Sequence, residues 1–251
     1  MTFLTDAHIH LSDEEFRSDM PYILTAMAKM NLRACCVSMD YPSSCATLAL
    51  AGRSSLILPF IGIHPEKAEN DPESVATLIT SNSSKISGIG EIGLDRTYVS
   101  DEEGFRRQKR VFEAMLSLAE KFRKPVSIHS RKTLDEIFSI LPSFRLGGSL
   151  LHWFAGSKKQ LKTAMDMGCF VSYGPAMVYS QDKQVLFSET LEDRILLETD
   201  GPVKFSRCFG HKTAQVTFLP SVLFCASELM GKSYEEALEI LGKNTNAYLG
   251  V

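Results

Sequence analysis

Short apolar runs alternate along the chain with longer amphipathic stretches. Eight of these runs are mostly rich in β-branched residues and apolar on both faces, as strands buried in a parallel sheet are. They cover residues 2–11, 32–39, 56–64, 86–94, 125–129, 149–154, 169–174 and 195–200. The pattern therefore predicts eight buried strands that run in the same direction.

The stretches between the runs carry helical signals. Within 101–123, apolar residues such as Phe105, Phe112 and Met115 recur with the period of a helix. Further helices are predicted over 42–52, 132–141, 157–168 and 181–192. Helix starts are predicted by Ser-x-x-Glu spacing at Ser12, Ser100 and Ser233, and by an Asp-Pro pair at Asp71.

Strands that alternate with helices through 251 residues predict a TIM-like (β/α)8 barrel, formed by a single domain over residues 1–251. A doubly wound open sheet is the structural alternative. No linker, low-complexity segment or change of composition divides the chain. The longest loop-like region, 201–220, follows the last predicted strand.

Composition narrows the class of protein. Apolar residues make up 44% and charged residues 23%, which is typical of a soluble globular protein. With a net charge of −3, contact with nucleic acid would have to be local. The six cysteines form no C-x-x-C pair and are interpreted as reduced thiols. No targeting segment or membrane span is predicted, so we expect a cytoplasmic protein; the sequence leaves its oligomeric state open.

Ionisable side chains gather at the apolar runs. Five of the six histidines lie in or directly after a run, and Glu91 and Asp200 are placed in the same way. The five are His8, His10, His64, His129 and His152. In a barrel the carboxyl ends of all strands share one face, so these side chains would converge there. Because burying so many ionisable groups without a cation is costly, the set predicts a metal centre.

The residue types indicate which ions would bind. His8 and His10 are two residues apart on a strand, so both side chains point to the same face and can chelate one ion. Histidine and carboxylate ligands without cysteine suit Zn²⁺, Mn²⁺, Fe²⁺ or Mg²⁺. The candidate ligands exceed what one four-coordinate ion needs: they are the histidines His8, His10, His129 and His152 and the carboxylates Glu91 and Asp200. They suit two ions about 3.5–4 Å apart that share a carboxylate.

Six motifs in order give a family resemblance. They are D-A-H-I-H at 6–10, G-I-H-P at 62–65, G-E-I-G-L-D at 90–95, P-V-S-I-H-S-R at 125–131, H-W-F-A-G at 152–156 and E-T-D-G-P at 198–202. With these motifs the chain resembles the TatD family of metal-dependent hydrolases, within the amidohydrolase-type barrels. The closing N-T-N-A-Y-L-G at 244–250 is similar to the C-terminal helix of that family.

The resemblance implies roles for single residues. The first ion would be held by His8, His10, Glu91 and Asp200, and the second by Glu91, His129 and His152, with Glu91 bridging. Related barrels often bridge with a carboxylated lysine after the fourth strand, but Lys85 precedes that strand here. His64 resembles a residue that contacts substrate beside the metals.

The resemblance also implies a reaction, the hydrolysis of a phosphodiester, with DNA as the usual substrate. Bound metal would lower the pKa of water to roughly 7. Asp200 would orient that water and accept its proton. His64 and Arg131 are candidates for phosphate contact, since the arginine fork matches two oxygens.

Other classes of function stay open at this stage. One alternative is a hydrolase that cleaves an amide, ester or lactone at the same site, and a second is a non-catalytic metal-binding protein. The loops at 96–104 and 201–215 should distinguish the first two classes. Arg96 and Tyr98 are candidates to flank the site.

Two features around the motifs bear on the substrate. The loop after the eighth run departs from the family pattern and keeps only scattered positive charge, at Lys204, Arg207, His211 and Lys212. Trp153 follows a predicted ligand. By strand alternation it is expected to pack against helices rather than to stack on a base.

Overall fold

Eight parallel strands form the centre of the molecule. The computed structural model describes residues 2–69 and 72–251. The strands are β1 (Leu4–Ile9), β2 (Leu32–Cys36), β3 (Ile57–Ile61), β4 (Gly88–Asp95), β5 (Val126–Arg131), β6 (Ser149–Leu151), β7 (Phe170–Tyr173) and β8 (Ile195–Leu197). They lie in the order β1 to β8 and each pairs in parallel with the next. The predicted (β/α)8 barrel is confirmed, and the open sheet is excluded.

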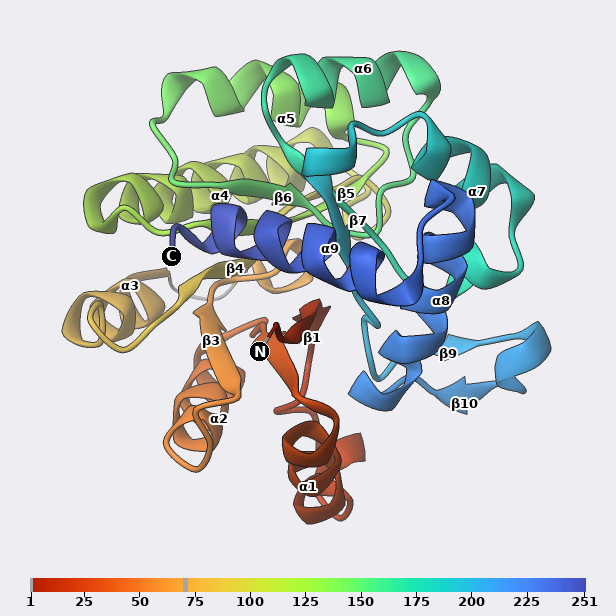
Figure 1. Ribbon diagram of the computed structural model, residues 1–251. Helices are drawn as coiled ribbons and strands as arrows, with labels where there is room; N and C mark the ends of the chain where they lie inside the picture. The colour runs from red at the N-terminus through yellow and green to blue at the C-terminus, as the bar shows by residue number, and fades with distance from the viewer. Residues whose placement is uncertain (1, 70–71) are drawn as a thin grey trace.

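Helices surround the barrel (Figure 1). They are α1 (Met20–Met30), α2 (Tyr41–Ala51), α3 (Pro72–Ser81), α4 (Glu102–Phe122), α5 (Leu134–Ile140), α6 (Lys158–Asp166), α7 (Gln181–Ser188), α8 (Leu219–Met230) and α9 (Tyr234–Leu249). The five helical segments predicted from periodicity are each present within a few residues. Among the described residues, no helix has the length and apolar character needed to cross a membrane.

At two of the predicted helix starts, the capping residue lies one position after the predicted serine. Asp13 caps a short 3-10 helix, Glu14–Phe16, and Asp101 caps α4, each by accepting a hydrogen bond from a backbone N–H. In both places an aspartate directly after the predicted serine takes the capping position. Ser233 does begin α9 with a complete capping box. The predicted cap Asp71 lies outside the described residues.

The barrel is completed between β1 and β8 by bonds beyond the regular strand pairing. The N–H of Asp200 donates to the carbonyl of His8 (2.9 Å), and the N–H of His10 donates to the carbonyl of Gly201 (2.8 Å). The buried carboxylate of Asp6 accepts hydrogen bonds from the N–H of Thr199 (3.0 Å) and that of His8 (3.2 Å). These bonds hold the ends of the first and last strands side by side.

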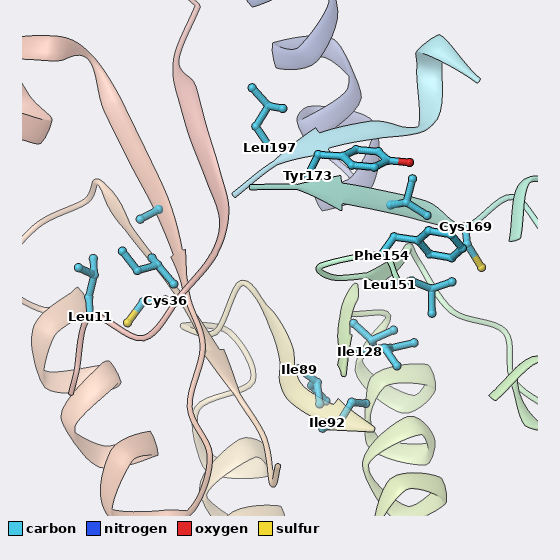
Figure 2. Packing of buried hydrophobic residues seen from close by; sticks show 14 of the residues in the cluster. Leu11, Cys36, Ile89, Ile92, Ile128, Leu151, Phe154, Cys169, Tyr173 and Leu197 are labelled. Atoms are coloured by element: carbon cyan, nitrogen blue, oxygen red, sulfur yellow. The ribbon is translucent and has the colours of Figure 1, made fainter. Parts of the chain in front are cut away.

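The main core lies between the strands and the helices. Figure 2 shows Ile92, Ile128 and Leu151 projecting from β4, β5 and β6 into this layer. A smaller cluster inside the barrel includes Phe60, Phe170 and Tyr248. Tyr248, on α9, donates a hydrogen bond to the carbonyl of Val126 (3.1 Å). Apolar packing on α9 thus fills one end of the barrel and leaves the other for polar side chains.

The region predicted as the longest loop contains regular structure. Strands β9 (Lys204–Phe205) and β10 (Lys212–Thr213) pair antiparallel and form a hairpin after β8. Short 3-10 helices cover Arg207–Phe209 and Val216–Phe218. In Figure 1 this hairpin projects beside the barrel.

Gly93 marks a close approach of backbones between β4 and β5. Its φ is +148°, and an added Cβ would lie 2.1 Å from the carbonyl oxygen of His129. We expect Gly93→Ala to lower the free energy of unfolding by roughly 3 kcal/mol, because a steric clash is added to backbone strain. Gly168→Ala is the matched control, since φ is +72° there and nothing lies within 4 Å of an added Cβ. It should cost only about 1–2 kcal/mol. Urea unfolding of both variants measures the difference, and equal losses would contradict the steric explanation.

Candidate metal centre

The predicted site residues come together at the carboxyl ends of the strands. They line a pocket of about 580 Å³ together with further side chains. The predicted residues in the pocket wall are His10, His64, Glu91, His129, Arg131, His152 and Asp200. His8 is fully buried directly beneath it, with its ring stacked on that of His152 at 3.7 Å.

The carboxylate of Glu91 lies at the centre of the histidines. Its Oε2 faces His10 Nε2 (3.2 Å) and His8 Nε2 (3.5 Å) from β1. Its Oε1 faces His152 Nε2 (2.8 Å) and His129 Nδ1 (2.9 Å) from the opposite side of the barrel. The two oxygens of one carboxylate therefore each meet a separate pair of the histidines predicted as metal ligands.

The backbone of β4 places Glu91 in that position. Its N–H donates to the carbonyl of Ser38 (2.8 Å), and the N–H of Ser38 donates to the carbonyl of Gly90 (3.2 Å). The pairing of β4 with β5 shifts register between Ile89 and Ile92. Such an irregularity re-aims a side chain, here that of Glu91 toward the histidines. Strand alternation alone does not predict which residues Glu91 contacts.

Asp200 closes the site on the side of β8. Its Oδ1 lies 3.6 Å from His8 Nε2 and 3.8 Å from His10 Nε2. Its backbone is left-handed, with φ of +51°, a conformation that carries strain in a non-glycine residue. Burial, reinforced by the negative charge of Glu198, raises the pKa of the Asp200 carboxyl well above its ordinary value. A cation beside it would favour the ionised form.

His64 lies closer to the centre than a peripheral substrate contact requires. Its Nε2 is 3.5 Å from Glu91 Oε1, and its Nδ1 accepts a hydrogen bond from the N–H of Glu66 (3.2 Å). Ligand-type atoms of His64, Glu91 and His129 all lie within 4.8 Å of one another. Burial lowers the pKa of His64 to about 4, so its imidazole is neutral at pH 7.

The histidines present suitable lone pairs to a cation. Burial lowers the pKa of His8 well below its ordinary value, and that of His152 also falls. Burial also acts to lower the pKa of His129, but hydrogen bonds with Asp95 and Glu91 outweigh it and raise this pKa to about 9. Two carboxylate partners hold a proton on each nitrogen of His129, and a cation would replace the one on Nδ1. This donor set, oxygen and imidazole nitrogen without sulfur, fits divalent ions.

Three buried carboxylates around the ligands were not assigned from the sequence. Asp95 Oδ2 bonds His129 Nε2 at 2.8 Å. Glu198 Oε2 lies 3.8 Å from His152 Nδ1, which has no hydrogen-bond partner in the part of the chain that the structure describes. Asp6 fixes the backbone of His8, as described above. Carboxylates commonly orient metal-ligating histidines in this way. All three lie inside the motifs D-A-H-I-H, G-E-I-G-L-D and E-T-D-G-P, which was the available signal.

The flanking residues divide into two groups. Tyr98 and Arg131 line the pocket, whereas Arg96 pairs with Glu102 (2.7 Å) and Glu136 (3.3 Å) outside it. Among the described residues, Arg131 has no ion-pair partner, so its guanidinium is free to meet an anion. It is also the only lysine or arginine among the described residues that line the pocket.

The hairpin residues with positive charge face elsewhere. Lys204, His211 and Lys212 line a separate surface hollow with Glu15, and Lys204 pairs with that glutamate at 3.2 Å. In the part of the chain that the structure describes, the hairpin therefore adds no lysine or arginine to the pocket wall beside Arg131.

The expected packing of Trp153 against helices is wrong. Strand β6 ends at Leu151, and Trp153 has a left-handed backbone with φ of +42°. The alternation of a strand therefore does not apply to it. Trp153 lies in the wall of the pocket, and Phe154 takes the place in the apolar layer (Figure 2).

A parallel barrel with histidines and carboxylates gathered at the carboxyl ends of its strands has the architecture of a metal-dependent hydrolase. Comparison with known families identifies the group within that class. The TatD related DNase family matches residues 5–250, and the chain belongs to this family.

Similar proteins cover nearly the whole chain. A metal-dependent hydrolase of Bacillus subtilis, YabD, is 28% identical over 248 residues, which cover 96% of each chain. The human deoxyribonuclease TATDN3 is 28% identical over 259 residues, covering 96% of this chain and 92% of its own. The crystal structure of YJJV, a TatD homologue of Escherichia coli, has a similar fold, with a TM-score of 0.90. It is 24% identical, and the match covers 99% of this chain and 98% of that one.

Proposed function

We propose that this hydrolase is a deoxyribonuclease that uses two divalent ions, Zn²⁺, Mg²⁺ or Mn²⁺. The position of Glu91 carries the proposal, because each of its oxygens faces a different pair of the histidines predicted as metal ligands. One ion would be held by His8, His10, Glu91 and Asp200, and the other by Glu91, His129 and His152. A location in the cytoplasm stays a prediction.

The chain's own residues supply the remaining parts of the reaction. Two bound divalent ions would lower the pKa of attacking water and neutralise charge on the phosphate oxygens. Asp200 orients the water and accepts its proton, since its carboxylate lies at the pocket wall beside His8 and His10. Arg131 and His64 contact the phosphate, Arg131 through its guanidinium in the pocket wall.

A panel of substrates tests which type of bond the enzyme cleaves. We expect hydrolysis of labelled single-stranded DNA in Mg²⁺, Mn²⁺ or Zn²⁺ to exceed hydrolysis of carboxylic esters, amides and lactones under the same conditions. Chelation should reduce the rate at least 100-fold, with recovery on adding excess metal, because the ions would lower the pKa of the attacking water and neutralise charge on the phosphate oxygens. Faster turnover of a carbonyl substrate would assign the site to an amide, ester or lactone. Full activity in chelator would refute the metal-dependent mechanism.

A further inference from the structure

Trp153 forms part of the pocket wall directly beside the predicted metal ligand His152. The backbone N–H of Trp153 donates to Glu198 Oε1 (2.8 Å) and lies 3.2 Å from Ser172 Oγ. The hydroxyl of Ser172 in turn donates to Glu198 Oε2 (2.6 Å). Glu198 and Ser172 are both buried. This buried network fixes the left-handed backbone of Trp153 and so fixes the place from which its indole extends.

The indole is supported from behind. Its ring packs on that of Phe205, with centroids 5.3 Å apart and planes inclined by 32°. Phe205 is buried and lines a cavity of about 10 Å³ on the far side of Trp153, but it does not line the larger pocket. Phe209 and Phe218, stacked at 4.8 Å, continue this aromatic cluster in the segment after β8. The indole of Trp153 therefore packs on Phe205 on one side and lines the larger pocket on the other.

The pocket offers more space than a phosphate group needs. Its volume of about 580 Å³ falls within the range of small-ligand pockets. The uncharged part of its wall consists of Met39, Tyr98, Trp153, Ala155 and Val203, with Ser130 as a polar addition. Tyr98 is 48% exposed and sets its ring edge-on to that of His64 at 5.7 Å. Aromatic surface thus lies next to the place where the phosphate is expected.

We propose that Trp153 stacks on the nucleobase of a nucleotide next to the scissile phosphate, an inference that rests on the proposed function. Every base has an aromatic face, so stacking binds nucleotides with little dependence on sequence. A base inside a duplex has both faces covered by its neighbours and must leave the stack to reach such a surface. The site therefore selects unpaired bases, at single-stranded ends or in single-stranded DNA, over paired ones.

Intrinsic fluorescence reports this contact directly, because Trp153 is the only tryptophan in the chain. The metal-loaded full chain is titrated with deoxyadenosine 5′- and 3′-monophosphates and, as the base-free control, with deoxyribose 5-phosphate. We expect saturable quenching by at least one of the two nucleotides and no change with the sugar phosphate. Equal responses to all three, or no response to any, would overturn stacking.

Kinetics separate the loss of stacking from general damage to the site. On single-stranded oligonucleotides, Trp153→Leu should raise KM about 5- to 150-fold with kcat nearly unchanged, and Trp153→Phe should raise it less. On an oligonucleotide with abasic residues at the cleaved end, wild type and Trp153→Leu should have equal KM. Identical effects of Trp153→Leu on both substrates would assign Trp153 a structural role only and overturn the proposal.

The two proposals fail in different ways. If the wild-type chain binds nucleotides with quenching but hydrolyses no DNA, the nuclease assignment is wrong and the stacking surface stands. If it hydrolyses DNA without quenching and without preference for base-bearing over abasic ends, the nuclease assignment stands and Trp153 is not a stacking surface. Comparison of single-stranded with blunt duplex DNA adds a further check, since a preference for the duplex would contradict selection of unpaired bases.

Discussion

Glu91→Gln is expected to remove most of the metal and nearly all of the activity. The amide keeps the size of the carboxylate but loses the negative charge that faces five histidine nitrogens within 3.5 Å. We expect the metal content to fall from about two ions per chain to one or fewer, as measured by elemental analysis. The hydrolytic rate should fall at least about 10³-fold, since several kcal/mol of charge stabilisation are lost and each 1.36 kcal/mol is a factor of ten.

Glu113→Gln provides the matched control for this variant. Glu113 lies exposed on α4, so the same chemical change there should leave metal content and rate unaltered. Thermal unfolding gives an independent readout. Metal at about 100 times its Kd should stabilise the wild type and the control by about 2.7 kcal/mol, whereas Glu91→Gln should lose most of that gain. Unchanged metal content in Glu91→Gln would refute the bridging role.

Asp200→Asn should lower kcat by about 10²- to 10⁴-fold, the usual contribution of a general base. Asparagine keeps one oxygen for a nearby cation but cannot accept a proton at neutral pH. We therefore expect KM for single-stranded DNA and the metal content to change less than about threefold. The combination separates a base from a ligand, because loss of a ligand alone would reduce both metal content and rate.

Asp182→Asn, on the exposed first turn of α7, is the control for this substitution and should retain full activity. A further variant, Asp200→Ala, removes the oxygen as well and should reduce metal content. If Asp200→Asn keeps the kcat of the wild type, another group accepts the proton, and His64 is the candidate, since it is a neutral imidazole 3.5 Å from Glu91 that is not among the predicted metal ligands.

The buried carboxylates show where sequence reasoning stops. Asp95 and Glu198 have the same residue type and similar burial as the predicted ligands Glu91 and Asp200. Their separation into ligands and supporting groups depends on which atoms they face across the barrel. Asp95 meets a histidine 34 residues away and Glu198 meets one 46 residues away, and neither spacing is encoded locally.

Periodicity and motif order were enough for much of this protein. Apolar runs with no polar face require burial on both sides, which only a covered parallel sheet provides, so eight strands and the barrel followed from the sequence. Histidines and acids at the ends of those runs then had one face to share. The residues that would bind metal could thereby be predicted from residue type and position in the chain, together with the family motifs.

The tertiary structure decided how those residues are arranged. Each oxygen of Glu91 faces a different pair of predicted histidine ligands. This arrangement depends on the register shift in β4 and on the backbone hydrogen bonds between β4 and Ser38. The direction of Trp153 depends on one left-handed residue just beyond β6, held by Glu198. Strand alternation ends where the strand ends, and side chains beyond that point follow contacts between distant segments. For this reason the metal centre was predictable as a set of residues, whereas the shape of the pocket above it was not.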